Sequence, residues 1–404
     1  MLGAGVFAAF APAAQAAGSG ILLALALAAF VAYCNATSSA ELAALYPQAG
    51  GTYVYGRERL GRFYGFLAGW SFVVGKVASC AAMALTFGNY AAPGAARPAA
   101  VAAVVVLTAV NTQGVQRTAG LTRIIVALVL MGLAVAVTAT LAGGDPQAGH
   151  LQPVVGTGGA YGLLQAAGIL FFAFAGYARL ATLGEEVVEP ERTIPRAILL
   201  ALAIVLAVYA AVGTAVLAVL GADRISESAA PIAAAVDAGT YDELVPIVRA
   251  AAAIACLGVL LSLIAGIGRT AFAMAANGEL PRALARVHPR HRVPWVAEVA
   301  VGVVVTALVA TVDLRHAIGF SSFAVLGYYA IANASAFTLG PQERRWPRVL
   351  TVAGVAGCVA LAVTLPWTSV AVGAGVLTAG ALLYAAAVTG SNRCHAYNSG
   401  DGDY

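Results

Sequence analysis

Residues 69–83 read GWSFVVGKVASCAAM, an apolar run that holds one charged side chain, Lys76. Lys76 is the only lysine of the chain, because every other basic residue in the Lys+Arg total of 22 is an arginine. The apolar run extends over about residues 63–90, longer than the ~20 residues that cross ~30 Å of hydrocarbon. The segment therefore predicts a helix that spans a membrane.

The composition extends this prediction to the whole chain. Hydrophobic residues make up 61% of the 404, charged residues 10%, and the mean hydropathy is +0.87, whereas a soluble domain carries about 25% charged residues. This apolar excess is too large for one buried core, so lipid must be the solvent for much of the surface. We therefore expect an all-α integral membrane protein.

Several functional classes find no support in the sequence. Neither a basic run nor an aromatic–basic patch suggests binding to nucleic acid. No Ser/His/Asp, Cys/His or metal-ligand constellation occurs at membrane depth, and the five cysteines show no metal or disulfide spacing. We expect no enzyme activity, no metal and no bound cofactor.

Apolar runs between turn signals predict about twelve transmembrane helices. They fall near residues 1–16, 19–45, 63–90, 98–111, 119–142, 160–184, 196–221, 244–275, 294–312, 317–340, 348–365 and 368–389.

Loop charges orient these spans. The loops after the even-numbered spans carry most of the arginines, namely Arg57, Arg59, Arg62, Arg117, Arg123, Arg192, Arg196, Arg282, Arg286, Arg290, Arg292, Arg344, Arg345 and Arg348. The alternate loops hold Arg97, Arg224 and Arg315. By the positive-inside rule we expect both termini of this multi-pass plasma-membrane protein in the cytoplasm. The polar, glycine-rich residues 390–404 predict a disordered cytoplasmic tail.

Two expected spans place glycine in mid-membrane. The first opens MLGAGVFAAFAP (1–12), and the sixth contains FFAFAGYARLATLGEEV (171–187). Glycine tolerates the backbone angles of an unwound segment, and positions one and six correspond in two successive sets of five spans. Paired interrupted helices are typical of inverted-repeat transporters, whose half-helix ends suit a zwitterion. Alternatively, these glycines only allow close helix packing.

Five motifs together resemble the amino-acid permeases of the amino acid–polyamine–organocation superfamily. They are GAGVF (3–7), AELAALYPQAGGTYVYGRERLG (40–61), NTQGVQRTAG (111–120), FFAFAGYARLATLGEEVVEPERTIPRAI (171–198) and RTAFAMAANGELPRALARVHP (269–289). The resemblance runs in order from Gly3 to about Leu339. It implies a LeuT-type fold of five-plus-five inverted repeats over residues 1–142 and 143–340, with two additional C-terminal helices over 341–389 and the tail 390–404.

The same resemblance implies a substrate site. Backbone N–H groups of Gly3, Ala4 and Gly5 would bind the α-carboxylate of an amino acid. Carbonyls of Phe171, Ala173 and Phe174 would lie near its α-amino group, and the side chains of Phe174 and Tyr177 would line or gate the pocket. The signatures YPQAGGTY (46–53) and ANGELPRAL (276–284) are expected to shape gating loops rather than to contact substrate.

Lys76 carries two alternative interpretations. It lies ~20 Å along the helix from Phe63, further than a lysine side chain reaches to an interface. Intramembrane charges usually face the bundle interior, and lysine, unlike arginine, can release its proton when desolvated. Lys76 is therefore a candidate proton carrier, or a surrogate for a coupling cation. Alternatively, it is a permanently charged strut bonded to carbonyls of a broken helix.

The sequence differs here from some prokaryotic members of the family. Those members place a lysine in the fifth span, where this chain has Val129, so their coupling mechanism does not carry over directly.

Three other charges receive gating or structural interpretations. Arg179 pairs locally or snorkels to the interface, or it takes part in gating or in binding the substrate carboxylate. Arg269 belongs to the cytoplasmic closure, and Glu41 is a partner for either arginine. A proton gradient is the expected driving force, with sodium left open.

We therefore expect a secondary active transporter for small zwitterionic amino acids, embedded in the bilayer as a monomer or homodimer. The alternative is a membrane sensor that binds amino acids without transporting them, or a truncated remnant. Family members normally carry residues upstream of the glycine motif that form the first half-helix, whereas this chain starts at Met1, two residues before Gly3. This difference predicts either a start codon assigned too late or a shortened form.

Overall fold

A computed structural model describes residues 3–48, 50–114, 119–152, 158–176, 187 and 189–398 of the chain. All regular structure in these ranges is helical. Eight helical stretches are long and apolar enough to cross a membrane, and three further apolar helices are shorter. In a bilayer the backbone must satisfy its own hydrogen bonds, which an α-helix does within one segment. The prediction of an all-α membrane protein is confirmed.

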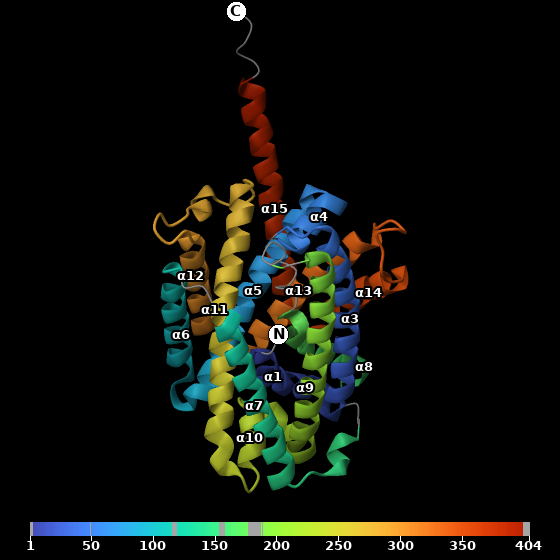
Figure 1. The fold of residues 1–404 in the computed structure, drawn as a ribbon, viewed down its shortest axis with the longest axis vertical. Helices are drawn as coiled ribbons and strands as arrows, with labels where there is room; N and C mark the ends of the chain where they lie inside the picture. Colours follow the sequence, from blue (N-terminus) through green and yellow to red (C-terminus); the bar gives the residue numbers. More distant parts are fainter. Residues whose placement is uncertain are drawn as a thin grey trace, which may run out of the picture.

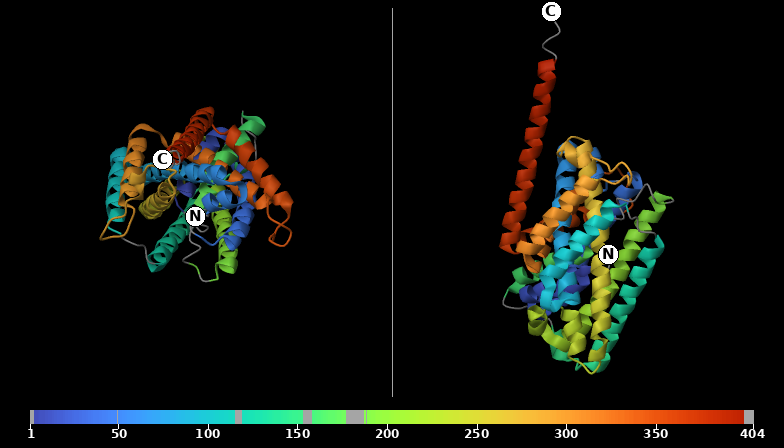
Figure 2. Two further views of the ribbon diagram at one scale, coloured as in Figure 1. Left: turned by 90° about the horizontal axis from the view of Figure 1, so that it is seen from above. Right: turned by 90° about the vertical axis from the view of Figure 1, so that its left-hand side faces the viewer.

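The helices form one elongated bundle, seen from three directions in Figures 1 and 2. The α-helices are α1 (Ala4–Ala8), α2 (Phe10–Ala17), α3 (Ile21–Leu45), α4 (Thr52–Leu60), α5 (Arg62–Ala91), α6 (Ala96–Thr112), α7 (Ala119–Gly143), α8 (Gly159–Phe174), α9 (Pro190–Glu227), α10 (Pro231–Asp237), α11 (Val245–Ala276), α12 (Trp295–Thr311), α13 (Leu314–Phe337), α14 (Arg348–Thr364) and α15 (Trp367–Asn398). Short 3-10 turns are η1 (Gly18–Gly20), η2 (Pro93–Ala95), η3 (Ala148–Leu151), η6 (Asp242–Leu244) and η7 (Arg282–Ala285).

The helices differ from the expected spans in several places. Helix α8 ends at Phe174, well before the expected end at 184. The loop between the second and third expected spans contains α4. Helix α15 continues to Asn398, into the tail for which we expected no regular structure, and projects beyond the bundle (Figures 1 and 2). Alanines 385–387 have high helix propensity and favour this extension. The number of helices that cross the bilayer stays a prediction.

Helix α5 is central to the packing of the bundle. It contacts α13 and α11 most extensively, and it also touches α1, α4, α6, α12 and α15. Its 30 residues are mostly buried, and Lys76, at 5% exposure, lies among them. The prediction that Lys76 faces the protein interior rather than lipid is therefore confirmed.

The arginine-bearing loops after α3, α11 and α13 meet at one end of the bundle, the upper end in Figure 1, which we call the arginine-rich end. Arg59 Nη2 pairs with Glu343 Oε1 at 2.8 Å, joining α4 to the loop before α14. Arg345 Nη1 donates to Glu191 O at 3.1 Å, which brings in the start of α9. The alternation of loop charges predicted this grouping.

A latch formed by Tyr53, Arg57, Asn277 and Glu279 joins α4 to the end of α11. Tyr53 Oη donates to Glu279 Oε2 at 2.9 Å and accepts from Asn277 Nδ2 at 2.8 Å. Arg57 Nη1 lies 3.5 Å from Glu279 Oε1. Burial raises the pKa of Glu279, an effect that Tyr53, Arg57 and Arg62 oppose in part. The two sequence signatures expected to shape gating loops are thus bonded to each other.

Asn333 of α13 forms the core of a buried polar network between α3, α13 and α14. Its Nδ2 donates to Asn35 Oδ1 at 2.6 Å and to Tyr329 O at 2.9 Å, and its Oδ1 accepts from Ser38 Oγ at 2.7 Å. Cys358 Sγ of α14 donates to Asn35 Oδ1 at 3.3 Å. Between helices in a membrane, such side-chain bonds replace the hydrophobic effect as a source of specific association.

Replacing Asn333 with alanine should destabilise the protein by about 1–2 kcal/mol, because Asn35 and Ser38 would be left buried without their partner. The free energy of unfolding in mixed micelles, titrated with a denaturing detergent, measures this loss. Ser335→Ala is the matched control, since the Ser335 hydroxyl bonds only within its own helix, to Ile331 O. An equal loss in the two variants would contradict the role of the network.

The latch should tighten as the pH falls. Because the buried Glu279 carboxyl has a raised pKa, it holds its proton more tightly in the latched than in an open state, so protonation favours the latch. Hydrogen-exchange protection of residues 50–60, corrected for intrinsic exchange rates, should therefore rise severalfold from about pH 8 to about pH 5. Glu279→Gln should remain protected without pH dependence, and Tyr53→Phe should lower protection at every pH. Protection that falls with the pH in the wild type would overturn this prediction.

Candidate functional site

The first helix begins inside the glycine motif. Gly3 has an extended backbone (φ −149°, ψ −152°), and α1 starts at Ala4. Helix α1 lies near mid-height of the bundle in Figure 1. The N–H groups of a first helical turn have no partners within the helix, so α1 presents them halfway along the bundle.

Close contacts explain why glycine is needed here. A Cβ added to Gly5 would lie 2.5 Å from Ala173 Cα, and one added to Gly3 would lie 2.8 Å from Val259 Cγ2. Any side chain at Gly5 would therefore push α1 away from the end of α8. The structure thus brings together two of the segments that sequence reasoning paired.

Helix α8 ends inside the bundle. Ala175 and Gly176 form a tight turn after Phe174, and the N–H of Ala175 bonds to Phe172 O. The last carbonyls of a helix have no intrahelical partners. Two side chains from other helices supply them, since Lys76 Nζ donates to Ala175 O at 2.9 Å and Tyr209 Oη donates to Ala173 O at 3.0 Å.

Lys76 is favourably placed for a cation. The C-terminal end of a helix carries partial negative charge, which attracts an ammonium group. Among the side chains that the structure describes, no carboxylate forms an ion pair with Lys76. One turn further along α5, Ser79 Oγ accepts or donates a 2.7 Å bond with Ser321 Oγ of α13. The bond to Ala175 O is the contact that the strut interpretation predicted.

The aromatic side chains of α8 are packed into the core. Phe171 stacks edge-on against Tyr329, with ring centroids 5.8 Å apart, and Phe174 contacts Tyr209 at 5.3 Å. Both phenylalanines are 0% exposed. In this conformation Phe174 therefore supports the end of α8 and is closed off from any open space. Tyr177, its expected partner in gating, lies outside the described residues.

Helix α1 has a second support that the sequence did not reveal. Tyr90 Oη of α5 donates to Phe7 O at 3.1 Å, and the two rings meet edge-on at 5.5 Å. Arg249 Nη1 of α11 donates to Tyr90 O at 3.1 Å. Tyr90 ends its apolar run and Tyr209 is a lone tyrosine in the middle of another, a weak signal that would have singled out both.

Two of the predicted gating charges, Glu41 and Arg269, lie at or toward the arginine-rich end. Glu41 Oε1 accepts backbone N–H bonds of 2.6 Å from Arg345 and from Trp346. This carboxylate therefore anchors the loop between α13 and α14, whereas the sequence suggested an arginine side chain as its partner. Arg269 of α11 is exposed and lies near Glu298, a buried carboxylate of α12 that sequence reasoning missed. Arg179 is outside the described part of the chain.

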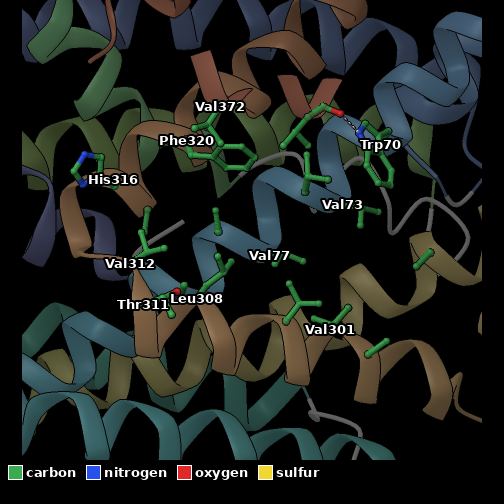
Figure 3. Close-up of a pocket in the computed structure, with 18 of the residues that line it drawn as sticks. Trp70, Val73, Val77, Val301, Leu308, Thr311, Val312, His316, Phe320 and Val372 are labelled. Atoms are coloured by element: carbon green, nitrogen blue, oxygen red, sulfur yellow. Dashed lines mark hydrogen bonds between the residues drawn. The ribbon is translucent and has the colours of Figure 1, made fainter. Parts of the chain in front are cut away.

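A cavity of about 1000 Å³ lies elsewhere (Figure 3), and Lys76 is not among its lining residues. It is lined mainly by apolar side chains of α5, α12, α13 and α15. None of the predicted substrate-site residues lines it. The contact of α1 with α8 and this cavity are therefore separate features.

The meeting point of α1, α5 and α8 can bind charge of both signs. It offers backbone N–H groups at the start of α1, carbonyls at the end of α8 and one ammonium group. Within the described residues, no group of three or more His, Cys, Asp and Glu side chains could hold a metal ion. The chemistry available here is reversible binding by hydrogen bonds.

Comparison with known proteins agrees with this geometry. The profile of the family described as amino acid permease matches residues 1–391. An uncharacterized transporter of Mycobacterium tuberculosis is 59% identical over 401 residues, covering 99% of this chain and 91% of the relative.

Two more distant relatives come from Bacillus subtilis. The serine/threonine exchanger SteT is 29% identical over 373 residues, covering 87% of this chain and 83% of its own. The branched-chain amino acid permease BcaP is 23% identical over 380 residues, covering 88% and 81%. The resemblance inferred from the sequence motifs is confirmed, and the chain belongs to the amino acid permease family of multi-pass membrane transporters.

Proposed function

We propose that this protein is a secondary active transporter that carries amino acids across the plasma membrane by alternating access. One observation carries the proposal: the start of α1 packs against the end of α8 at Gly5 and Ala173, and Lys76 binds that end at Ala175 O. Helix ends of opposite polarity meet here halfway along the bundle. Alternating access needs a site that both sides of the membrane can reach in turn, and mid-bundle helix ends supply one.

The fold that goes with this function is the LeuT-type arrangement of five plus five spans. The segments up to α7 would form the first repeat, α8 to α13 the second, and α14 and α15 would be peripheral. The start of α1 and the end of α8 lie in the first and sixth segments, which would be equivalent positions of the two repeats. The arginine-rich end would face the cytoplasm by the positive-inside rule, which puts the latch at the inner closure.

The substrate would bind as a zwitterion. Its carboxylate would accept bonds from the N–H groups of Gly3, Ala4 and Gly5, where helix polarity favours negative charge. Its ammonium would bind carbonyls of Phe171, Ala173 and Phe174. Ala173 O already accepts from Tyr209, yet a carbonyl oxygen has a second lone pair for the substrate.

Neutral amino acids fit these surroundings best. The described side chains around the end of α8 are apolar or aromatic, with hydroxyl groups and one ammonium but no carboxylate in hydrogen-bond contact. A cationic side chain would find no counter-charge among the described residues there, and Lys76 would repel it. The relatives named for branched-chain amino acids and for serine and threonine act on this class of substrate.

Coupling to protons would act through Lys76. The charged ammonium holds the end of α8, and loss of its proton would weaken that hold, since a neutral amine is a poorer donor and lacks the charge that the helix end attracts. The protonation state of one lysine would then bias the position of α8 relative to α5. A lysine that keeps its proton throughout, as in the strut interpretation, would hold α8 against α5 equally in every state and would not respond to a proton gradient.

Gly5→Ala should abolish substrate binding and uptake while leaving the protein folded, because its Cβ would force α1 away from Ala173. Binding of a panel of neutral, cationic and acidic amino acids to purified protein, and their uptake into proteoliposomes, measure the two effects. Gly375→Ala is the matched control, since no atom lies within 4 Å of a Cβ at that position of α15. Wild-type binding by Gly5→Ala would refute the site, and binding without uptake in the wild type would favour a sensor.

Lys76 variants separate a proton carrier from a strut. With an inward proton gradient imposed on proteoliposomes, Lys76→Ala should lose at least tenfold in gradient-driven uptake, because the helix end loses its partner. Lys76→Arg should keep binding but lose stimulation by the gradient, because arginine keeps its proton. Full gradient-driven uptake by Lys76→Arg would establish the strut instead. Equal uptake by all three proteins would exclude both roles.

A further inference from the structure

The cavity behind α5 is a groove that runs along the bundle. On α5 it is lined by Trp70, Val73 and Val77, which recur at helical spacing on the side opposite to Lys76 and Ser79. Figure 3 shows these side chains facing Val301 and Leu308 of α12, with Phe320 and Val372 beyond them. We refer to this space as the α5 groove.

The middle of the α5 groove is suited only to an apolar ligand. The indole N–H of Trp70 is already bonded, donating to Val376 O at 2.9 Å. The polar lining side chains, among them Thr311, Asp313 and His316, gather near the junction of α12 and α13. Two lining valines, Val304 and Val372, are 49% and 56% exposed, so the groove opens sideways toward the surrounding lipid.

The α5 groove has room for a hydrocarbon chain. Its cavity measures about 1000 Å³, is lined mainly by apolar side chains and opens toward the lipid. A thin, extended acyl chain can enter such a groove from the side.

Charge distinguishes the two ends of the α5 groove. At the arginine-rich end it is lined by Leu280, which precedes η7, and by Leu284, which is part of η7. The exposed Arg282 lies between these two leucines in the chain. Exposed Arg62 begins α5 at the same end, where its charge acts on Glu279. At the other end the Asp313 carboxylate engages His316, whose Nδ1 lies 2.7 Å away, and Arg315 is bonded to Gln15 Oε1.

We propose that the α5 groove binds one acyl chain of an anionic phospholipid, whose phosphate lies at the arginine-rich end near Arg62 and Arg282. The lipid would support the lipid-facing side of α5 while Lys76 engages α8 on the other side. The site rests on the membrane location of the chain alone, so it stands or falls independently of what the protein transports.

Lipid retained by the purified full-length protein tests this proposal. Extraction and mass spectrometry should find about one phosphatidylglycerol per chain after delipidating washes, with phosphatidylcholine at least fivefold lower when both are supplied in equal amounts. Val372→Trp fills the groove and should lose the retained lipid at least fivefold. Val359→Trp on α14 is the matched control, since that valine is 52% exposed and lies outside the groove lining.

The headgroup is tested separately. Arg62→Gln combined with Arg282→Gln should abolish the preference for phosphatidylglycerol, whereas Arg290→Gln should leave it unchanged. Brominated phosphatidylglycerol quenches the fluorescence of a tryptophan that it contacts, and the Trp70 contribution is the difference between wild type and Trp70→Phe. Quenching of this contribution reports whether the groove of the wild-type protein is occupied, so this test does not depend on whether a groove variant folds. Equal lipid retention by Val372→Trp and wild type, no quenching of Trp70, or a lipid-free dimer with the groove covered would each overturn the proposal.

Discussion

The bond from the Lys76 ammonium to the carbonyl of Ala175 is the interaction on which the centre of the bundle depends. A helix that ends inside a bilayer leaves carbonyls without partners, and an ammonium at that depth is costly unless it is paired. Each group here offsets the cost of the other. The pairing fixes the end of α8 against α5, and the Gly5 contact with Ala173 then sets α1 beside both.

Helix α5 owes its position to two different faces. The face with Lys76 and Ser79 makes polar contacts with α8 and α13, and the opposite face is apolar and borders the α5 groove. Hydrophobic burial gives little preference between helices and lipid, so specific polar contacts decide which helices associate. The Asn333 network does the same for α3, α13 and α14.

The arginine-rich end follows another rule, because water and lipid headgroups are available there. Its contacts are ion pairs and backbone bonds of carboxylates, as in the latch and in the capping of the loop before α14 by Glu41. The exposed ion pairs among these contacts are modest in energy, whereas the buried Glu41 holds its loop through two backbone bonds. Tyr209, Tyr90 and Lys76 hold the middle of the bundle.

The sequence by itself determined the membrane class, the family, the grouping of arginine loops and the inward orientation of Lys76, because all of these follow from composition, run length and local motifs. It also located the interruption near residues 171–187, since glycine and the residues around it are local signals. Only the tertiary structure decided which partners meet: Ala175 O for Lys76, Tyr209 for Ala173 O, loop backbone for Glu41, and Asn35 with Ser38 for Asn333. A single polar residue in an apolar run has no periodic pattern, and its partner depends on how distant helices pack.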